Sequence, residues 1–235
     1  MVSLRSIRDY RRRRRQERRD RPYADNAFPH RLDYRWEDIR YNRVSLINAA
    51  LARRGGATAR YLEIGCAGNA CFDSILALDK IGVDPARGGT HRMTSDAFFA
   101  ANDRRFDVVF VDGLHEFAQC RRDAVHAIDV CEVGGFVLFH DFLPRDWRSA
   151  NVPALQGEWT GDVWKTAFEL ASSDGIEFKL VEIDHGVGVA RKIRQDWRYA
   201  DRFAALQALK FKDLYARHRE LPLIGPHDAL RWIAA

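Results

Sequence analysis

Cysteine is scarce in this sequence, and long apolar runs are absent. Only four of its 235 residues are cysteine, and no two of them form a C-x-x-C pair. This spacing disfavours a zinc site or a set of disulfides, so we interpret Cys66, Cys71, Cys120 and Cys131 as small buried apolar residues. No stretch approaches the roughly 18 apolar residues of a membrane span, and the chain does not open with an apolar secretory segment. We therefore expect a cytoplasmic protein with no membrane span.

Negative charge is scarce at the amino-terminal end. Residues 1–22 hold ten arginines against three acids, a net charge of +7, whereas the whole chain carries +5. The remaining residues are therefore slightly acidic, at −2, and any attraction to phosphate comes from the arm formed by residues 1–22. We expect a mobile, solvated and partly helical arm, suited to contact a second copy in a homodimer, in preference to a nucleic-acid site.

The stretch 60–71 combines an apolar run with an abrupt turn of small residues. The apolar residues predict a buried strand over 60–64, and the glycines that follow let the backbone approach a ligand closely. A second strand, over 80–84, ends at Asp84, 21 residues beyond Glu63. A carboxylate in that place is positioned to accept hydrogen bonds from ribose hydroxyls. This pair of strands is typical of a nucleotide-like cofactor site in a parallel sheet, with an intervening helix that carries Phe72, Ile75, Leu76 and Leu78.

The rest of the chain continues the alternation of strands and helices. Before the first strand, the apolar spacing predicts a helix over 44–54. After the second strand it predicts a short strand at 91–93, a helical turn at 97–101, a strand over 106–112, a helix over 116–131 and a strand over 136–139. The last part of the chain should form a helix starting at Asp162, a hairpin of 176–183 and 187–193, a helix over 197–217 and a tail. This pattern predicts an α/β fold with a doubly wound, Rossmann-like, mostly parallel sheet, a terminal antiparallel hairpin and helices on both faces. We divide the chain into the arm 1–22, a cover segment and helix 23–58, a core 59–193, and a helix and tail 194–235.

The glycine turn does not have the dinucleotide pattern G-x-G-x-x-G, in which each glycine has a steric role. It reads Gly65-Cys66-Ala67-Gly68-Asn69-Ala70. With the preceding glutamate, the Gly-Val-Asp-Pro strand end and the late hairpin, residues 44–193 resemble the class I S-adenosylmethionine-dependent methyltransferases. The resemblance implies S-adenosylmethionine as cofactor. It places cofactor contacts at Glu63, Gly65, Cys66, Gly68, Asp84, Asp96, Ala97 and Asp112, with Asp84 on the ribose and Asp96 and Ala97 beside the adenine.

A second group of polar residues follows the two central strands. Asp112 and His115 leave the strand over 106–112, and His140 and Asp141 leave the next one. Because the carboxyl ends of parallel strands share one edge of the sheet, we expect these side chains to converge. Carboxylate oxygens suit Mg²⁺, whereas a histidine ligand admits Mn²⁺ or another transition ion. Each residue alone is as easily a helix cap, but together they favour a divalent metal site.

The phrases Val109-Phe110-Val111-Asp112-Gly113-Leu114-His115 and Gly134-Gly135-Phe136-Val137-Leu138-Phe139-His140-Asp141 carry a narrower resemblance. They are similar to the metal-dependent O-methyltransferases related to the caffeoyl-CoA, catechol and macrolide-sugar enzymes. The resemblance implies that Asp112, His140 and Asp141 bind the metal, with His140 in place of the more usual carboxylate. It also implies that His115 is the base. Such a cation lowers the pKa of an acceptor hydroxyl, and an imidazole removes the proton.

The sequence therefore predicts a divalent-metal-assisted O-methyltransferase, with catalytic residues His115 and Asp112. Its acceptor would be a hydroxyl of a small molecule, with a sugar-containing acceptor slightly ahead of a catechol. Two alternatives stay open: an RNA methyltransferase that grips phosphate with the arm, and a cofactor-binding protein without activity. Against the first, the sequence lacks the Asn/Asp-Pro-Pro-aromatic turn of enzymes that methylate amino groups of nucleic acids.

Overall fold

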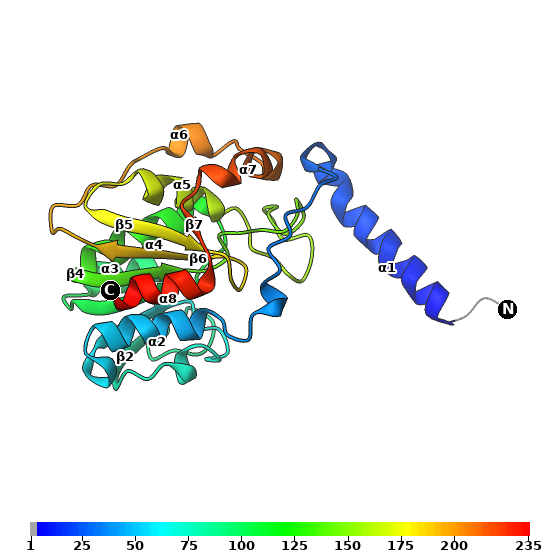
Figure 1. Ribbon diagram of the computed structural model, residues 1–235. Coiled ribbons are helices and arrows are strands. Elements are labelled where there is room, and N and C mark those ends of the chain that lie inside the picture. Colours follow the sequence, from blue (N-terminus) through cyan, green and yellow to red (C-terminus); the bar gives the residue numbers. More distant parts are fainter. Residues whose placement is uncertain (1–3) are drawn as a thin grey trace.

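The computed structural model describes residues 4–235, and a seven-stranded mixed sheet lies at its centre (Figure 1). The strands run in the order β2-β1-β3-β4-β6-β5-β7. Their bounds are β1 Arg60–Ile64, β2 Asp79–Val83, β3 Phe106–Val111, β4 Cys131–Phe139, β5 Ile176–Val181, β6 Val187–Lys192 and β7 Leu223–Ile224. Strands β2, β1, β3 and β4 are parallel, whereas β6 is antiparallel to both of its neighbours. The predicted fold class and terminal hairpin are confirmed.

Eight α-helices surround or extend from this sheet in the described part of the chain. They are α1 Leu4–Asp20, α2 Arg43–Arg53, α3 Ser95–Ala101, α4 Phe117–Val130, α5 Trp164–Ser172, α6 Phe203–Leu206, α7 Phe211–Arg217 and α8 Pro226–Ala234. Short 3₁₀ turns are η1 Arg21–Asn26, η2 Trp36–Asp38, η3 Gly56–Thr58, η4 Phe72–Ser74 and η5 His218–Glu220.

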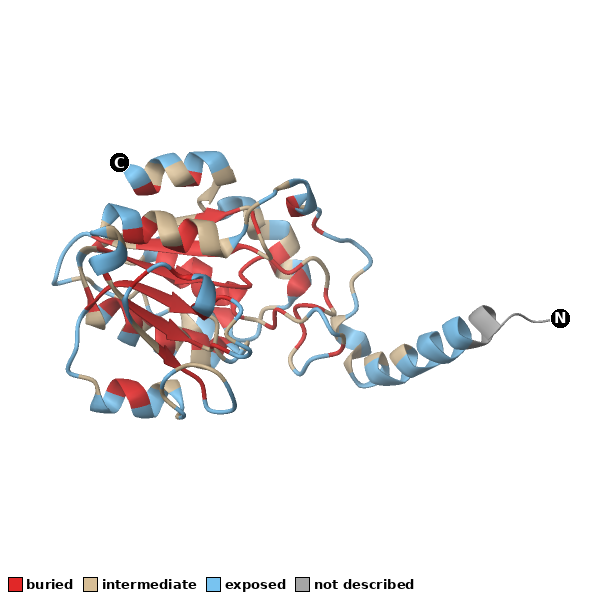
Figure 2. Ribbon diagram, turned by 90° about the horizontal axis from the view of Figure 1, so that it is seen from below, coloured by how far each residue is buried: buried red, intermediate tan, exposed pale blue. Residues whose placement is uncertain are grey.

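Helices cover both faces of the sheet, and because successive strand side chains point to opposite faces, both sets are buried. On β3, Val108 and Phe110 pack with α2 and α8, whereas Val109 and Val111 pack with the helices of the other face, among them α4 and α5. Figure 2 shows the resulting buried strands between the two helical layers. Both sides of β3 are buried in the core, so its polar groups lie at its two ends: Asp107 near the start pairs with Arg60, and Asp112 follows the carboxyl end.

The prediction of a helix after the glycine turn is wrong. The structure has only the 3₁₀ turn Phe72–Ser74, and Leu76 and Leu78 are 70% and 84% exposed. The ammonium of Lys80 donates hydrogen bonds to the carbonyls of Phe72 and Ile75, which a continuing helix would need for itself. The backbone here is thus satisfied by a side chain from β2 rather than by helical pairing.

Three further predictions are corrected. The strand at 91–93 is a single bridge between His91 and Val83. The helix over 197–217 is divided into α6 and α7, and α7 begins after Lys210, whose amide donates to the Asp213 carboxylate. The last twenty residues are not a tail, because β7 extends the sheet edge beside β5 and α8 packs against α2.

The basic arm forms helix α1, which extends away from the body in both ribbon views (Figures 1 and 2). Its carboxyl-terminal end contacts the loop after β4, where Gln16 donates to the Leu155 carbonyl and Asp20 pairs with Arg148 at 2.9 Å. None of the helices described is both long and apolar enough to cross a membrane. All four cysteines are buried and free, as predicted.

Candidate functional site

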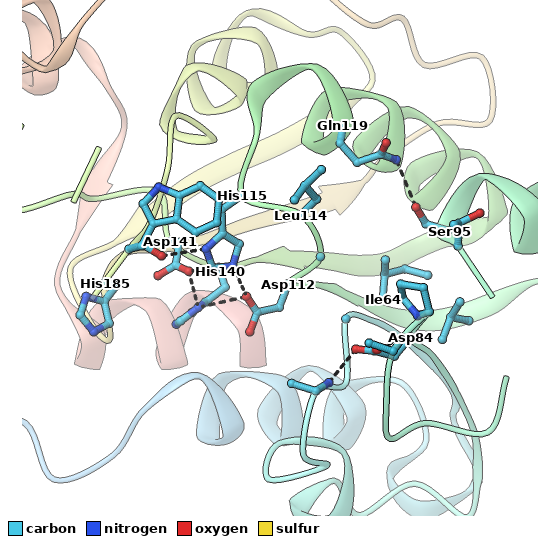
Figure 3. Close-up of a pocket in the computed structure, with 18 of the residues that line it drawn as sticks. Ile64, Asp84, Ser95, Asp112, Leu114, His115, Gln119, His140, Asp141 and His185 are labelled. Carbon is cyan, nitrogen blue, oxygen red and sulfur yellow. Dashed lines mark hydrogen bonds and ion pairs between the residues drawn. The ribbon is translucent and has the colours of Figure 1, made fainter. Parts of the chain in front are cut away.

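A cavity of about 820 Å³ opens where β1 to β4 end (Figure 3). This volume suits a cofactor together with a small second molecule. Polar and apolar groups from several elements meet there, and the wall includes Arg43, Ile64, Gly65, Ala67, Asp84, Thr94, Ser95, Asp96, Asp112, Leu114, His115, Gln119, His140, Asp141, Glu158, Trp159, Asp184 and His185. The predicted edge of the sheet is therefore the site of the main cavity.

Asp84 holds the glycine turn in place on one side of the cavity. Its Oδ2 accepts a hydrogen bond from the Ala67 amide at 2.8 Å, and its Oδ1 accepts from the amides of Ala86 and Arg87. Burial opposes ionisation, but these amides outweigh it and keep the pKa of Asp84 below its ordinary value. Asp84 is thus an ionised group that ties the turn to the end of β2.

Gly65 allows the glycine turn to approach the end of β3. Its φ is +88°, and a Cβ there would lie 2.0 Å from the carbonyl oxygen of Asp112. Only glycine tolerates both the left-handed backbone and this contact. The cofactor turn and the polar cluster after β3 are therefore in direct backbone contact.

Not all of the expected cofactor residues reach the cavity. Gly65, Asp84, Asp96 and Asp112 line it, but the wall does not include Glu63, Cys66, Gly68 or Ala97. Because strand side chains alternate, Ile64 faces the cavity and Glu63 points to the other face, where it is fully buried. There the Tyr61 hydroxyl donates a hydrogen bond to it, and burial raises the pKa of Glu63 to about 7.

Asp112, His115, His140 and Asp141 converge as predicted from the two strand ends (Figure 3). His115 Nε2 lies 3.4 Å from Asp112 Oδ1 and 3.2 Å from Asp141 Oδ2. His140 Nδ1 lies 3.4 Å and 3.3 Å from the same two oxygens. Each carboxylate oxygen is therefore shared by two imidazoles, and we call these four residues the His-Asp cluster.

The carboxylates and imidazoles of the His-Asp cluster favour one another's charged forms. Burial opposes ionisation of Asp112, but the two imidazoles outweigh it and hold the pKa of Asp112 well below its ordinary range. Burial likewise opposes protonation of His140, yet Asp112 and Asp141 raise its pKa well above the usual value. The pKa of His115 is also raised, because the same carboxylates outweigh its burial. The cluster thus concentrates negative oxygen around a position that attracts positive charge.

The cluster has the donors and the spacing that a divalent cation requires. The ligand atoms of Asp112, His115 and Asp141 all lie within 4.8 Å of one another. Oxygen and nitrogen ligands that share an ion at about 2.1 Å lie about 3 Å apart at neighbouring positions, close to the separations of these side chains. The residues present therefore fit a metal ion.

Two cavity residues behind His140 escaped the sequence analysis. Arg43, at the start of α2, pairs with Asp184 at 2.7 Å, and His140 Nε2 lies 3.6 Å from Asp184 Oδ1 and 3.4 Å from Arg43 Nη1. Asp184 and its neighbour His185 turn the β5–β6 hairpin with φ of +47° and +61°. Non-glycine residues at positive φ mark a constrained turn, but a sequence pattern gives no sign of where that turn lies in the fold.

A family profile described as a methyltransferase domain matches residues 49–142. No curated protein sequence matches the chain. Among solved structures, a proposed O-methyltransferase from Klebsiella pneumoniae is 14% identical over 77% of this chain and 90% of its own, with a TM-score of 0.50. Another is the O-methyltransferase TomG of Streptomyces achromogenes, which is involved in tomaymycin synthesis and was solved with S-adenosylmethionine. It is 15% identical over 76% of this chain and 88% of its own, with a TM-score of 0.48.

A third similar structure is the mycinamycin-pathway methyltransferase MycE, solved with magnesium, S-adenosylhomocysteine and mycinamycin VI. It is 20% identical over 59% of this chain and 46% of its own, with a TM-score of 0.39. The chain thus spans about half the length of this relative. At such identities the structural likeness concerns the fold. The profile covers less than half of the chain, and within this fold it shows that residues 49–142 are similar to a methyltransferase domain, which is the predicted type of enzyme.

Proposed function

We propose that the protein transfers a methyl group from S-adenosylmethionine to a hydroxyl of a small molecule, with the help of a divalent cation. The observation that carries the proposal is the meeting of the glycine turn and the His-Asp cluster in one cavity. Gly65 and Asp112 touch through their backbones, so donor and acceptor would be bound side by side. Holding two reactants together replaces a bimolecular encounter.

Asp112, His140 and Asp141 would hold the cation, as the sequence analysis expected. When bound, a divalent cation lowers the pKa of an acceptor hydroxyl and fixes its direction, and the sulfonium of the cofactor supplies the methyl group. His115, expected to be the base, would take up the proton of that hydroxyl. Asp84 and Gly65 would hold the donor, with Asp96 near its adenine.

The acceptor side of the cavity favours a ring-containing molecule. Trp159 lies on this wall, with its ring centroid 5.3 Å from that of His115, and Glu158 and His185 are nearby lining residues. An aromatic face with adjacent polar groups suits a sugar, which offers both apolar C–H groups and hydroxyls. We therefore propose a sugar-containing acceptor ahead of a catechol.

The test is methyl transfer from isotope-labelled S-adenosylmethionine to a panel of hydroxylated sugars, glycosides and catechols. We expect wild-type protein to label one class of acceptor, and Asp141→Ala to lose at least about 100-fold in turnover, as expected for loss of electrostatic stabilisation at the reacting oxygen. Asp196→Ala, at an exposed aspartate of the loop after β6, is the control and should match wild type. Equal turnover of Asp141→Ala and wild type would refute the proposed role of the cluster.

A further inference from the structure

We infer that His115 is itself a ligand of the divalent cation, so that the site selects a transition ion over magnesium. The inference rests on the proposed function, which requires a cation in the His-Asp cluster. It replaces the expectation that His115 is the base, because a nitrogen lone pair bound to a cation cannot also accept a proton.

The hydrogen bonding of His115 fixes which of its nitrogens faces the cluster. Nδ1 lies 2.8 Å from the carbonyl oxygen of Trp159. A carbonyl oxygen only accepts hydrogen bonds, so Nδ1 carries the proton in the neutral ring and Nε2 carries the lone pair. That lone pair points at Asp112 Oδ1 and Asp141 Oδ2. Two carboxylate oxygens and a ring nitrogen that face one another need a positive charge between them, which a proton on Nε2 supplies without metal and which a bound cation supplies by displacing that proton.

The Trp159 carbonyl is the outer partner that a metal-binding histidine requires. Metal-binding histidines donate their second ring N–H to a carboxylate or backbone carbonyl, which sets the tautomer and the ring orientation. Here the carbonyl is itself held, because the Trp159 indole donates to the Asn151 carbonyl at 2.6 Å. The amides of Thr160 and Gly161 both donate to the carbonyl of Ser149, which fixes the same loop from the other side.

Gly161 permits the contact between this loop and His115. Its φ is +63°, and a Cβ there would lie 1.7 Å from the His115 carbonyl oxygen. The loop after β4 can therefore approach the backbone of His115 only with glycine at this position. A metal ligand gains affinity from a ring that is already oriented.

A histidine ligand changes which ion the site prefers. Mg²⁺ favours oxygen ligands and retains several waters, whereas imidazole suits transition ions such as iron, nickel and zinc, and the affinity of such a site rises from manganese through iron to cobalt. The protein ligands would then be the carboxylates of Asp112 and Asp141 and the imidazoles of His115 and His140. Half of the donor atoms from the protein would therefore be nitrogen. We therefore expect Co²⁺ and Mn²⁺ to bind more tightly than Mg²⁺.

The test is calorimetric titration of the chelator-treated full chain with Co²⁺ and, separately, with Mg²⁺, in the absence of cofactor and acceptor. We expect His115→Ala to lower Co²⁺ affinity by at least about 100-fold, since even outer-sphere partners of ligands contribute about 10–100-fold. Mg²⁺ affinity should change much less. His227→Gln is the matched control for Co²⁺ affinity, because His227 is an exposed histidine of α8 that does not line the cavity.

A second measurement avoids any change to the fold. In wild-type protein with ¹⁵N-labelled histidine, pulsed electron paramagnetic resonance of bound Mn²⁺ should detect couplings that His115→Ala removes in part. Unchanged Co²⁺ affinity and unchanged histidine couplings in a folded His115→Ala protein would overturn the inference and restore His115 as the base. Failure of wild-type protein to bind Co²⁺ or Mn²⁺ would also overturn it. Neither outcome depends on methyl transfer, so failure of the proposed O-methyltransferase function would appear separately in the acceptor screen.

Discussion

The Tyr61 hydroxyl donates a 2.6 Å hydrogen bond to Oε2 of Glu63, on the face of β1 that α2 covers. The other carboxyl oxygen of Glu63 is buried and has no hydrogen-bond partner. An unsatisfied buried carboxylate is costly when ionised, so burial favours the neutral acid. The resulting pKa of about 7 places its ionisation in the physiological range.

Glu63→Gln should stabilise the protein at alkaline pH. The folded-state pKa of about 7 exceeds the ordinary value of 4.5, so the unfolded chain loses its proton first. Wild type therefore loses stability as the pH rises from about 4.5 to 7, and the amide variant does not. At 1.36 kcal/mol per pKa unit, the difference in unfolding free energy between Glu63→Gln and wild type should change by about 3 kcal/mol from pH 4 to pH 8. Urea unfolding at both pH values measures it.

The control is Glu177→Gln, an exposed position on β5. Its unfolding free energy relative to wild type should not change in this way with pH. A Glu63→Gln protein whose stability difference from wild type is the same at pH 4 and pH 8 would contradict the buried, neutral state of Glu63.

Gly65→Ala and Gly68→Ala form a matched pair within the glycine turn. At Gly65 the new Cβ would overlap the Asp112 carbonyl and the backbone is left-handed, whereas nothing lies within 4 Å at Gly68. We expect Gly65→Ala to destabilise the fold by about 2 kcal/mol or more, through strain at a special φ and overpacking. The unfolding free energy of Gly68→Ala should lie within about 0.5 kcal/mol of the wild-type value. Thermal unfolding compares them, and equal stability would refute the tight contact.

Asp84→Asn should weaken cofactor binding. The carboxylate accepts three backbone hydrogen bonds, and an amide has only one acceptor oxygen for them. We expect a loss of about 1–3 kcal/mol in stability and a parallel fall in S-adenosylmethionine affinity measured by calorimetry. Asp79→Asn, at the exposed start of β2 where the aspartate pairs with Arg104, is the control. Equal cofactor affinity in the two variants would argue against Asp84 as the residue that holds the turn.

The buried strands were predictable from sequence because they are continuous apolar runs. Strands β1, β3 and β4 lie within one or two residues of their predicted carboxyl ends, and so the Asp and His residues that follow them converge as expected. Parallel strands bring their carboxyl ends to one edge whatever the helices between them do. For the same reason, the missing helix after the glycine turn did not disturb the predicted cluster.

The remaining errors arise where distant side chains decide the local structure. Lys80 takes the carbonyls that a helix at 72–78 would use, and a local apolar pattern contains no sign of it. Strand β7 has two residues, and pairing with β5 rather than propensity makes it a strand. Arg43 and Asp184 are brought to His140 from 97 residues before and 44 residues after it in the sequence. Only the folded chain shows that these two residues belong to the site.

Removing residues 2–15 should leave the fold and small-molecule turnover intact. The described side chains from residue 8 to residue 15 lie on an exposed helix, and the contacts of α1 with the body begin at Gln16. We expect a change of less than about 0.5 kcal/mol in unfolding free energy, as for other surface changes. Turnover on the acceptor found in the screen is the second readout. Loss of that turnover together with a salt-sensitive RNA interaction would instead support the RNA methyltransferase alternative.

Methyl transfer should depend on a divalent cation, because the His-Asp cluster would hold that cation beside the acceptor hydroxyl. The measurement is the rate of labelled methyl transfer to the best acceptor by chelator-treated protein, before and after stepwise addition of Mn²⁺, Co²⁺ or Mg²⁺. We expect transfer close to background without metal and its recovery with an added divalent ion. Transfer at the full rate by metal-free protein in the presence of chelator would contradict it.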